Sequence, residues 1–163
     1  MVTILAAAFA VDQGTKLWAL SALVDGNVVP LVPTLRFELY SNPGIAFGIG
    51  ADVGLPLVIG LVILVIALMV WIVVQLLRRE PLPGTVFLAI AAGGASGNIW
   101  DRISRAENGP LSGHVVDFIA VDWFAIFNVA DIFTTCGVAL WAVATATVNR
   151  RSIRFGPPVA RPE

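Results

Sequence analysis

Long apolar stretches separated by short polar ones dominate this sequence. The clearest covers residues 55–77 and contains no charged side chain. At a rise of about 1.5 Å per residue, a helix of that length crosses a hydrocarbon layer of about 30 Å. Arg78, Arg79 and Glu80 follow it directly. The pattern therefore predicts a membrane-spanning helix over residues 55–77.

Three further apolar stretches are predicted to span a membrane, at about residues 2–23, 84–100 and 124–148. Polar residues interrupt the first and the last of them, namely Asp12, Gln13, Lys16, Asn128 and Asp131. No Lys or Arg precedes the first apolar run, so we interpret this stretch as a retained span and not as a cleaved export signal.

Composition agrees with lipid as the surroundings of these helices. Hydrophobic residues make up 58% of the 163 residues and charged residues 13%, whereas about a quarter of a soluble domain is charged. We expect an all-α integral membrane protein in which residues 1–163 form a single domain built on four transmembrane helices.

The basic residues predict the orientation of the bundle. They lie between the second and third spans and after the fourth, at Arg78, Arg79, Arg150, Arg151 and Arg154. Basic residues favour the cytoplasmic side, so both termini are expected there. Segments 24–53 and 101–123 then face outward, and residues 149–163 are expected to form a disordered cytoplasmic tail.

The outward segments carry strand patterns. Residues 35–40 alternate apolar and polar side chains, which is typical of a strand. Residues 41–44 supply a turn, and residues 45–47 are predicted to return as a second strand. A third strand is expected over residues 115–119. Because isolated hairpins are marginally stable, we expect one small sheet on the outer membrane face.

Polar side chains within the spans gather near the predicted outward ends. An ionisable group at the centre of a spanning helix costs about 2.5–3.5 kcal/mol, so each is expected to face protein or a wet cavity. Several of them stand three or four residues apart and therefore share a helix face: Asp12 with Lys16, Asn98 with Asp101 and Arg102, and Asn128 with Asp131.

Small residues fill positions 91–97, where Gly93 and Gly97 stand four apart. This spacing lets helices approach closely in lipid and would draw Asn98 and Arg102 toward neighbouring helices. In the alternative interpretation, the glycines only pack the bundle.

Two acidic residues are candidates for catalysis. Asp117 lies in a short apolar stretch of the outer segment, and Asp131 lies near the start of the last span. Two carboxyls close together in a low-dielectric site share a proton, so one can activate water while the other polarises a carbonyl. The residues alone leave alternatives open. Asp131 would then only pack helices, Asp117 would end a strand, and Asp12 with Lys16 would form an ion pair that orients the first span.

Other chemistries have few residues to support them. The only cysteine is Cys136 and the only histidine is His114, which excludes an intrachain disulfide and leaves too few ligands for zinc. Cys136 is expected to be buried and His114 to lie at the surface or a sheet edge. Four other acids are expected to be solvated loop residues: Asp25, Asp52, Glu107 and Asp122. No metal, cofactor or nucleic-acid partner is predicted.

Five motifs stand in order along the chain: DQGTK at 12–16, NPGIAF at 42–47, GGASGNIWDR at 93–102, VVDF at 115–118 and FNVAD at 127–131. Together they resemble the bacterial lipoprotein signal peptidase (signal peptidase II) family over about residues 11–140. The resemblance implies a monomeric aspartyl endopeptidase of the cytoplasmic membrane, with its active site near the outer face. Its substrates would be prolipoproteins in contact with membrane lipids, cut just before a cysteine that carries diacylglycerol.

The resemblance also implies roles for individual residues. The catalytic pair would be Asp117 and Asp131. Supporting or substrate-binding residues would be Asp12, Lys16, Asn42, Gly44, Asn98, Asp101, Arg102, Asn128 and Ala130. The chain departs from the family pattern at Trp100, where a smaller aliphatic residue is expected, and at residues 134–136, where apolar residues are commoner.

Two other classes of membrane protein fit the same polar residues. A proton-coupled transporter would relay protons through Asp12 and Asp131, although the chain lacks the internal repeat of many transporter folds. A structural membrane subunit would use its polar residues only to hold helices together.

Overall fold

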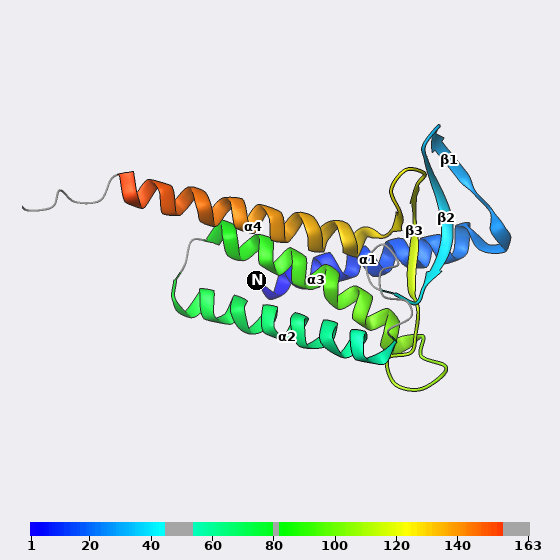
Figure 1. Cartoon of the computed structure of the whole chain (residues 1–163), viewed down its shortest axis with the longest axis horizontal. Coiled ribbons are helices and arrows are strands. Elements are labelled where there is room, and N and C mark those ends of the chain that lie inside the picture. Colours follow the sequence, from blue (N-terminus) through cyan, green and yellow to red (C-terminus); the bar gives the residue numbers. More distant parts are fainter. Residues whose placement is uncertain (45–53, 80–81, 155–163) are drawn as a thin grey trace, which may run out of the picture.

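A computed structural model describes residues 1–44, 54–79 and 82–154. The chain runs through α1 (Val2–Ala22), the 3-10 turn η1 (Val24–Gly26), β1 (Val29–Val32), β2 (Leu35–Asn42), α2 (Leu55–Leu77), α3 (Leu82–Ser104), β3 (Val115–Val121), β4 (Ile126–Phe127) and α4 (Val129–Arg154). The helices lie side by side with the sheet across one end of the bundle (Figure 1).

Helices α1 and α2 have nearly the predicted bounds. Within the described residues, three helical segments are long and apolar enough to cross a membrane: Leu55–Leu77, Leu82–Ser104 and Val129–Thr147. Helix α1 is not among them. The chain therefore has a helical membrane fold with a small antiparallel sheet.

The ends of α3 and α4 differ from the prediction. Helix α3 continues through Asp101 to Ser104, because the polar side chains of its last turn have partners inside the protein. Helix α4 begins only at Val129, after β4, and extends to Arg154. Residues 149–154 are thus helical and not a disordered tail, and residues 155–163 lie outside the described part of the chain.

Helix α1 buries its charged residues and exposes apolar ones. Asp12 and Lys16 are 0% exposed, whereas Val2 is 83% and Leu17 63% exposed. Helix α2 likewise exposes many aliphatic side chains, including Ile63. An exposed apolar surface of this extent requires surroundings other than water, and lipid meets that requirement.

Helix α3 is the central helix and contacts α1, α2 and α4. Its glycines permit these contacts, as the sequence predicted. A Cβ at Gly93 would lie 2.5 Å from the Leu5 carbonyl oxygen of α1, and one at Gly94 would lie 2.7 Å from the Ala130 carbonyl oxygen of α4. Both distances are too short for a side chain, so the glycines set the spacing between the helix backbones.

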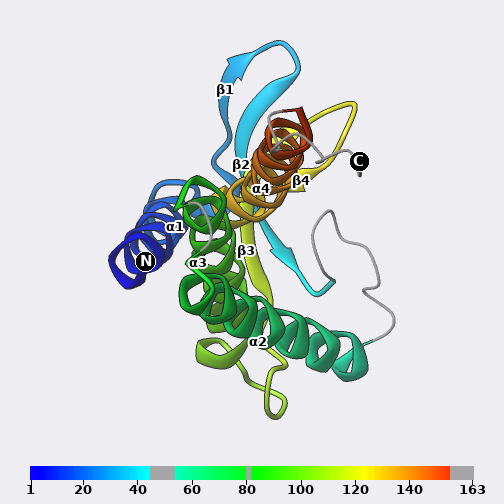
Figure 2. The same cartoon turned by 90° about the vertical axis from the view of Figure 1, so that its left-hand side faces the viewer.

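The sheet is antiparallel with strand order β1-β2-β3-β4. Its β1–β2 hairpin extends beyond the helices when the bundle is viewed end on (Figure 2). The strands expected at 35–40 and 115–119 are confirmed as β2 and β3, each two residues longer. Strands β1 and β4 were not predicted, and the return strand expected at 45–47 lies outside the described residues.

Aromatic contacts attach the sheet to the end of α1. The Trp18 ring lies 5.2 Å from that of Phe37 in β2 and 6.0 Å from that of Phe118 in β3. Phe118 also packs on Ala19 and Leu23 in a small buried cluster. These contacts hold β3 against the helices and so place Asp117, the residue before Phe118, beside the bundle.

Candidate active site

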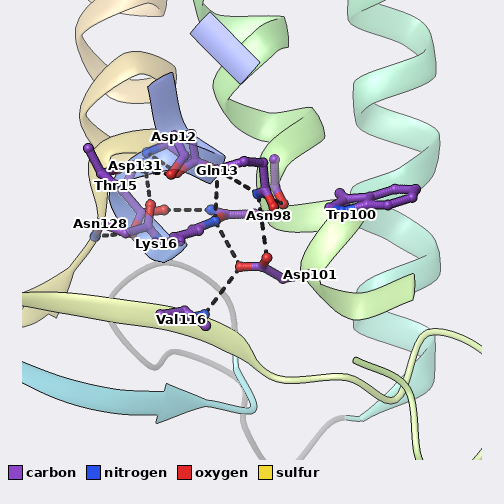
Figure 3. Close-up of polar contacts among 12 residues, drawn as sticks. Asp12, Gln13, Thr15, Lys16, Asn98, Trp100, Asp101, Val116, Asn128 and Asp131 are labelled. Carbon is purple, nitrogen blue, oxygen red and sulfur yellow. Dashed lines mark hydrogen bonds and ion pairs between the residues drawn. The ribbon is translucent and has the colours of Figure 1, made fainter. Parts of the chain in front are cut away.

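Polar side chains from α1, β2, β3, α3 and α4 meet at the sheet end of the helices. The fully or nearly fully buried ones near this end are Asp12, Lys16, Asn42, Asp101, Arg102, Asp117, Asn128 and Asp131. Hydrogen bonds and ion pairs join these residues with Asn98, Gly44 and Ala130 in one network, so the structure brings all the predicted site residues together. Figure 3 shows the part of this network around Lys16.

Lys16 lies at the centre of the network. Its Nζ is 2.9 Å from Asp12 Oδ2, 2.9 Å from Asp101 Oδ2 and 2.8 Å from Asn98 Oδ1 (Figure 3). An ammonium group has three N–H donors, and here each has an acceptor. The buried charge of Lys16 is therefore fully hydrogen-bonded, and it connects α1 with α3.

The two carboxylates beside Lys16 also hold backbone groups. Asp12 Oδ1 accepts a hydrogen bond from the Ala130 amide at 3.0 Å, and Asp101 Oδ2 accepts one from the Val116 amide at 3.2 Å. The first bond joins α1 to the start of α4, and the second joins α3 to β3. Asp12 and Asp101 thus fix the two segments that carry Asp131 and Asp117.

Gly97 makes room for the Asp12 carboxyl. A Cβ at this position would lie 2.1 Å from Asp12 Oδ2, so a larger residue would displace a side chain that three polar partners hold in place. The role of Gly97 therefore goes beyond packing of the helix backbones.

Arg102 holds the loops around the site. Its guanidinium donates to the carbonyl oxygens of Pro43 and Gly113, both at 3.3 Å, and to that of Gly44. Gly44 N in turn donates to Asn42 Oδ1 at 2.8 Å. The end of β2 is thereby tied to α3, which positions Asn42.

Asp117 lies fully buried in β3 between two asparagines. Its Oδ2 accepts a hydrogen bond from Asn42 Nδ2 at 2.7 Å, and its Oδ1 accepts one from Asn128 Nδ2 at 2.7 Å. Burial raises the pKa of the Asp117 carboxyl from 3.8 to about 7. The nearby charge of Asp131 raises this pKa further, whereas the two amide donors and Lys16 act in the opposite direction.

Asp131 and Asn128 form a reciprocal cap at the start of α4. The Asp131 amide donates to Asn128 Oδ1 at 3.0 Å, and the Asn128 amide donates to Asp131 Oδ2 at 3.2 Å. This is the geometry of a capping box, which satisfies two backbone donors at a helix N-terminus. The position of the Asp131 carboxyl is therefore set by the backbone of the helix that carries it.

Two asparagines connect the carboxyls. Asn128 contacts Asp117 through its side chain and Asp131 through its backbone amide. Asn98 Nδ2 donates to Asp131 Oδ1 at 2.9 Å, while Asn98 Oδ1 accepts from Asn128 Nδ2 at 3.1 Å. Both oxygens of each aspartate thus accept hydrogen bonds, and the pair is held rigidly.

A cavity of about 130 Å³ opens beside this pair. It is lined by Leu61, Ala95, Asn98, Arg102, Val115, Asp131, Thr134 and Thr135. Its volume is sufficient for water next to the Asp131 carboxyl. A carboxyl that meets water in a cavity can act as a general base.

Among the described residues, no group of three His, Cys, Asp or Glu side chains is arranged to hold a metal ion. Positive charge comes from Lys16, which contacts Asp12 and Asp101, and from Arg102, which lines the same cavity as Asp131.

Several residues predicted to lie outside the site do so. His114 is exposed at the start of β3 and contacts Ser41, 2.9 Å from its Oγ. Asp25, Glu107 and Asp122 are exposed, and Asp52 lies outside the described residues. Cys136, however, is exposed and not buried, because the face of α4 that packs on α3 passes through Gly137.

The sequence interpretation did not assign a role to Gln13 or Thr135. Gln13 Nε2 contacts the carboxyls of Asp12 and Asp101, and Thr135 lines the cavity. Gln13 was recognisable as a polar residue that interrupts an apolar helix next to Asp12. The sequence signal at Thr135 is a polar side chain where the family pattern has an apolar one.

Comparisons with known proteins agree on one family. A family profile described as "Signal peptidase (SPase) II" matches residues 4–147. The lipoprotein signal peptidase of Bifidobacterium adolescentis is 46% identical over 128 residues, 78% of this chain and 65% of that protein. The chain thus spans slightly less than two thirds of that relative. The lipoprotein signal peptidase of Mycobacterium avium is 36% identical over 93% of this chain and 84% of its own length.

Solved structures give the same result at the level of the fold. A bacterial membrane enzyme solved by the in meso method at 2.3 Å resolution superposes with a TM-score of 0.73, at 26% identity, over 98% of this chain and 93% of its own. A second, solved at 1.9 Å resolution, gives 0.67 at 28% identity over 88% and 90% of the two chains.

Proposed function

Because this chain belongs to the signal peptidase II family, membrane proteases that remove signal peptides from prolipoproteins, we propose that it cleaves diacylglyceryl-modified prolipoproteins with Asp117 and Asp131 as its catalytic pair. The observation that carries this proposal is the junction of the two carboxyls through Asn128, beside a cavity that reaches Asp131. The bond cut is the one on the N-terminal side of the lipidated cysteine.

In the proposed mechanism Asp131 activates water and Asp117 carries the shared proton. Asp131 lines the cavity, where the mechanism places the attacking water, whereas Asp117 is fully buried behind two amide donors. The mechanism therefore requires the bound substrate to reach the buried Asp117 carboxyl, whose proton polarises the scissile carbonyl while Asp131 accepts a proton from the attacking water. That proton then passes to the departing cysteine nitrogen.

Lys16 and the asparagines support this division of roles. Ionised Asp131 keeps two N–H donors, from Asn98 Nδ2 and the Asn128 amide. Lys16 donates to the same Asn98 side chain, so one side chain and two hydrogen bonds connect its positive charge with the Asp131 carboxylate. Donors fixed before the reaction stabilise developing charge without reorganisation.

We further propose that α1 is a fourth membrane span and that the sheet faces outward. The inverted burial of α1, with charges inside and apolar residues outside, supports the span. Arg78 and Arg79 lie at the turn between α2 and α3, at the opposite end of the bundle from the sheet (Figure 1). Basic residues favour the cytoplasmic side, so the termini are cytoplasmic and the site is near the outer face.

The proposed enzyme acts as a monomer in contact with membrane lipid. Among the described residues, one chain supplies both aspartates and the asparagines that hydrogen-bond them, which supports a site built within a single copy. The exposed aliphatic face of α2 is available to the acyl chains of lipids and of the modified substrate.

The activity is tested with purified protein in detergent or lipid and two forms of one precursor. We expect cleavage of the diacylglyceryl-modified form before its cysteine and at least about tenfold slower cleavage of the unmodified form, because binding energy from the lipid is lost. Mass spectrometry of the products identifies the bond. Equal rates on both forms would contradict the proposed substrate class, and cleavage of neither would contradict the activity.

The pH dependence tests the shared proton. Because burial raises the pKa of Asp117 to about 7, raising the pH through that value removes the proton that the mechanism needs. We expect kcat/KM to fall on the alkaline side with an apparent pKa near this value, one that belongs to the pair as a whole. Initial rates measured from roughly pH 5 to 9 check this. A rate that continues to rise across the whole alkaline side would contradict the assignment.

A further inference from the structure

Hydroxyl groups on a membrane helix need hydrogen-bond partners, because lipid supplies none. Helix α4 meets this need internally at three of its four threonines. Thr134, Thr145 and Thr147 each donate to a carbonyl three or four residues earlier in the same helix, at 2.7 to 2.9 Å. Among the described residues, the hydroxyl of Thr135 has no such partner.

Thr135 lies on the wall of the cavity that reaches Asp131. Because it follows Asp131 by four residues in α4, it stands about 6 Å further from the sheet along the helix axis. Asn98 and Arg102 line the same cavity from α3, and both already have protein partners. Thr135 is thus a polar group of this wall that remains free to bind a ligand.

The direction of α4 indicates which part of a substrate would meet Thr135. In the proposed orientation the signal peptide lies in the membrane and its residues before the scissile bond lie deeper than Asp131. An extended peptide advances about 3.3 Å per residue, so the distance of about 6 Å corresponds to about two residues. Thr135 is therefore level with the backbone about two residues before the cut.

We infer that the Thr135 hydroxyl hydrogen-bonds the peptide backbone of the signal peptide about two residues before the scissile bond. The inference rests on the proposed function and adds a positioning residue to it. The hydroxyl can donate to a carbonyl or accept from an amide, so it recognises the backbone of any sequence. It therefore aligns the substrate without selecting its side chains.

The test compares Thr135→Val, which removes the hydroxyl at nearly constant shape, with Thr135→Ser, which keeps it. With the diacylglyceryl-modified precursor we expect Thr135→Val to raise KM about tenfold at nearly unchanged kcat, as for the loss of one hydrogen bond that forms on binding. Thr135→Ser should stay within about twofold of the unsubstituted protein. Thr145→Val is the matched control, because it removes an α4 hydroxyl that bonds only to its own helix.

Three results would overturn the inference. They are an unchanged KM in Thr135→Val, an equal rise in KM in Thr135→Val and Thr135→Ser, or a fall in the kcat of Thr135→Val at constant KM. The unfolding temperature of each variant separates a packing defect from a binding defect. Failure of the proposed function is distinguishable from failure of this inference, because in that case the unsubstituted protein itself would leave the modified precursor uncut. The inference would then be wrong as well.

Discussion

Replacing Asp117 or Asp131 by asparagine is expected to lower kcat for the modified precursor at least about a thousandfold, since each change removes a group that transfers a proton in the reaction. Asparagine has nearly the same shape but cannot share a proton. Each substituted side chain keeps one oxygen that accepts one of the two N–H donors, and its new NH2 group replaces the other acceptor, so each variant loses one hydrogen bond and keeps one. The fold should therefore persist while turnover is lost, as measured by single-turnover cleavage and thermal unfolding in detergent.

Asp25→Asn provides the matched control for both variants. Asp25 is exposed in η1 with a φ of 60°, a conformation that asparagine tolerates well. We expect the cleavage rate of Asp25→Asn to equal that of the unsubstituted protein. If Asp117→Asn or Asp131→Asn turned over within about tenfold of the unsubstituted protein, the proposed pair would be wrong. If both variants lost assembly as well as turnover, a purely structural role for these residues would be favoured.

Replacing Lys16 by methionine is expected to have the largest effect on stability. Lys16 is fully buried between Asp12 and Asp101. Removing it leaves the Asp12 carboxylate without a basic partner and leaves Asp101 only its longer contact with Arg105, at 3.5 Å. Breaking a buried ion pair on one side typically costs about 3–5 kcal/mol. We expect the free energy of unfolding to fall by about this amount and the activity to fall with it, because the same cluster holds β3 and α4 in place.

Arg36→Met is the control for the loss of a basic residue. Arg36 also contacts two carboxylates, Glu38 and Asp122, but its side chain is 35% exposed, and ion pairs in contact with water contribute little. The unfolding temperature of the Arg36→Met variant should therefore hardly change. The double variant Lys16→Met with Asp12→Asn should regain part of the lost stability, because it removes one of the unpaired charges. If the stability and activity of Lys16→Met were unchanged, the role assigned to this ion cluster would be wrong.

Much of the helical part of the fold was predictable, because membrane spans depend on runs of apolar residues. The ends of α3 and α4 were not. Asp101 and Arg102 look like residues of an aqueous loop, but their partners lie on other segments: Asp101 contacts Lys16 of α1, and Arg102 contacts the end of β2. Whether a charged residue ends a helix depends on such distant partners, which a local pattern does not contain.

The small strands of the sheet were predictable only in part. Strands β2 and β3 have the side chains expected of strands, but β1 exposes all four of its residues and includes Pro30. Proline normally argues against a strand and is tolerated at a sheet edge, where β1 lies. Strand β4 has only two residues, too few for any alternation. Both strands depend on their neighbours in the sheet.

The pairing of Asp117 with Asp131 was predicted from a family resemblance, and the physics of the sequence only made it plausible. Spacing placed Asp12 with Lys16 because both lie on α1, and Asn128 with Asp131 because they stand three residues apart at the start of α4. Asp117 lies on a strand, and its junction with Asp131 passes through Asn128. That junction depends on how the sheet docks on α1, which residue spacing alone does not determine.

The reciprocal cap at the start of α4 limits how this site can change under selection by an inhibitor. A compound that bonds to Asp131 and Asn128 engages the same two residues that begin the helix. A substitution that evades the compound by altering either residue also removes a helix cap, which typically stabilises by about 1 kcal/mol. Escape is therefore more accessible at the cavity wall, at residues such as Leu61 that line the cavity but do not build the cap.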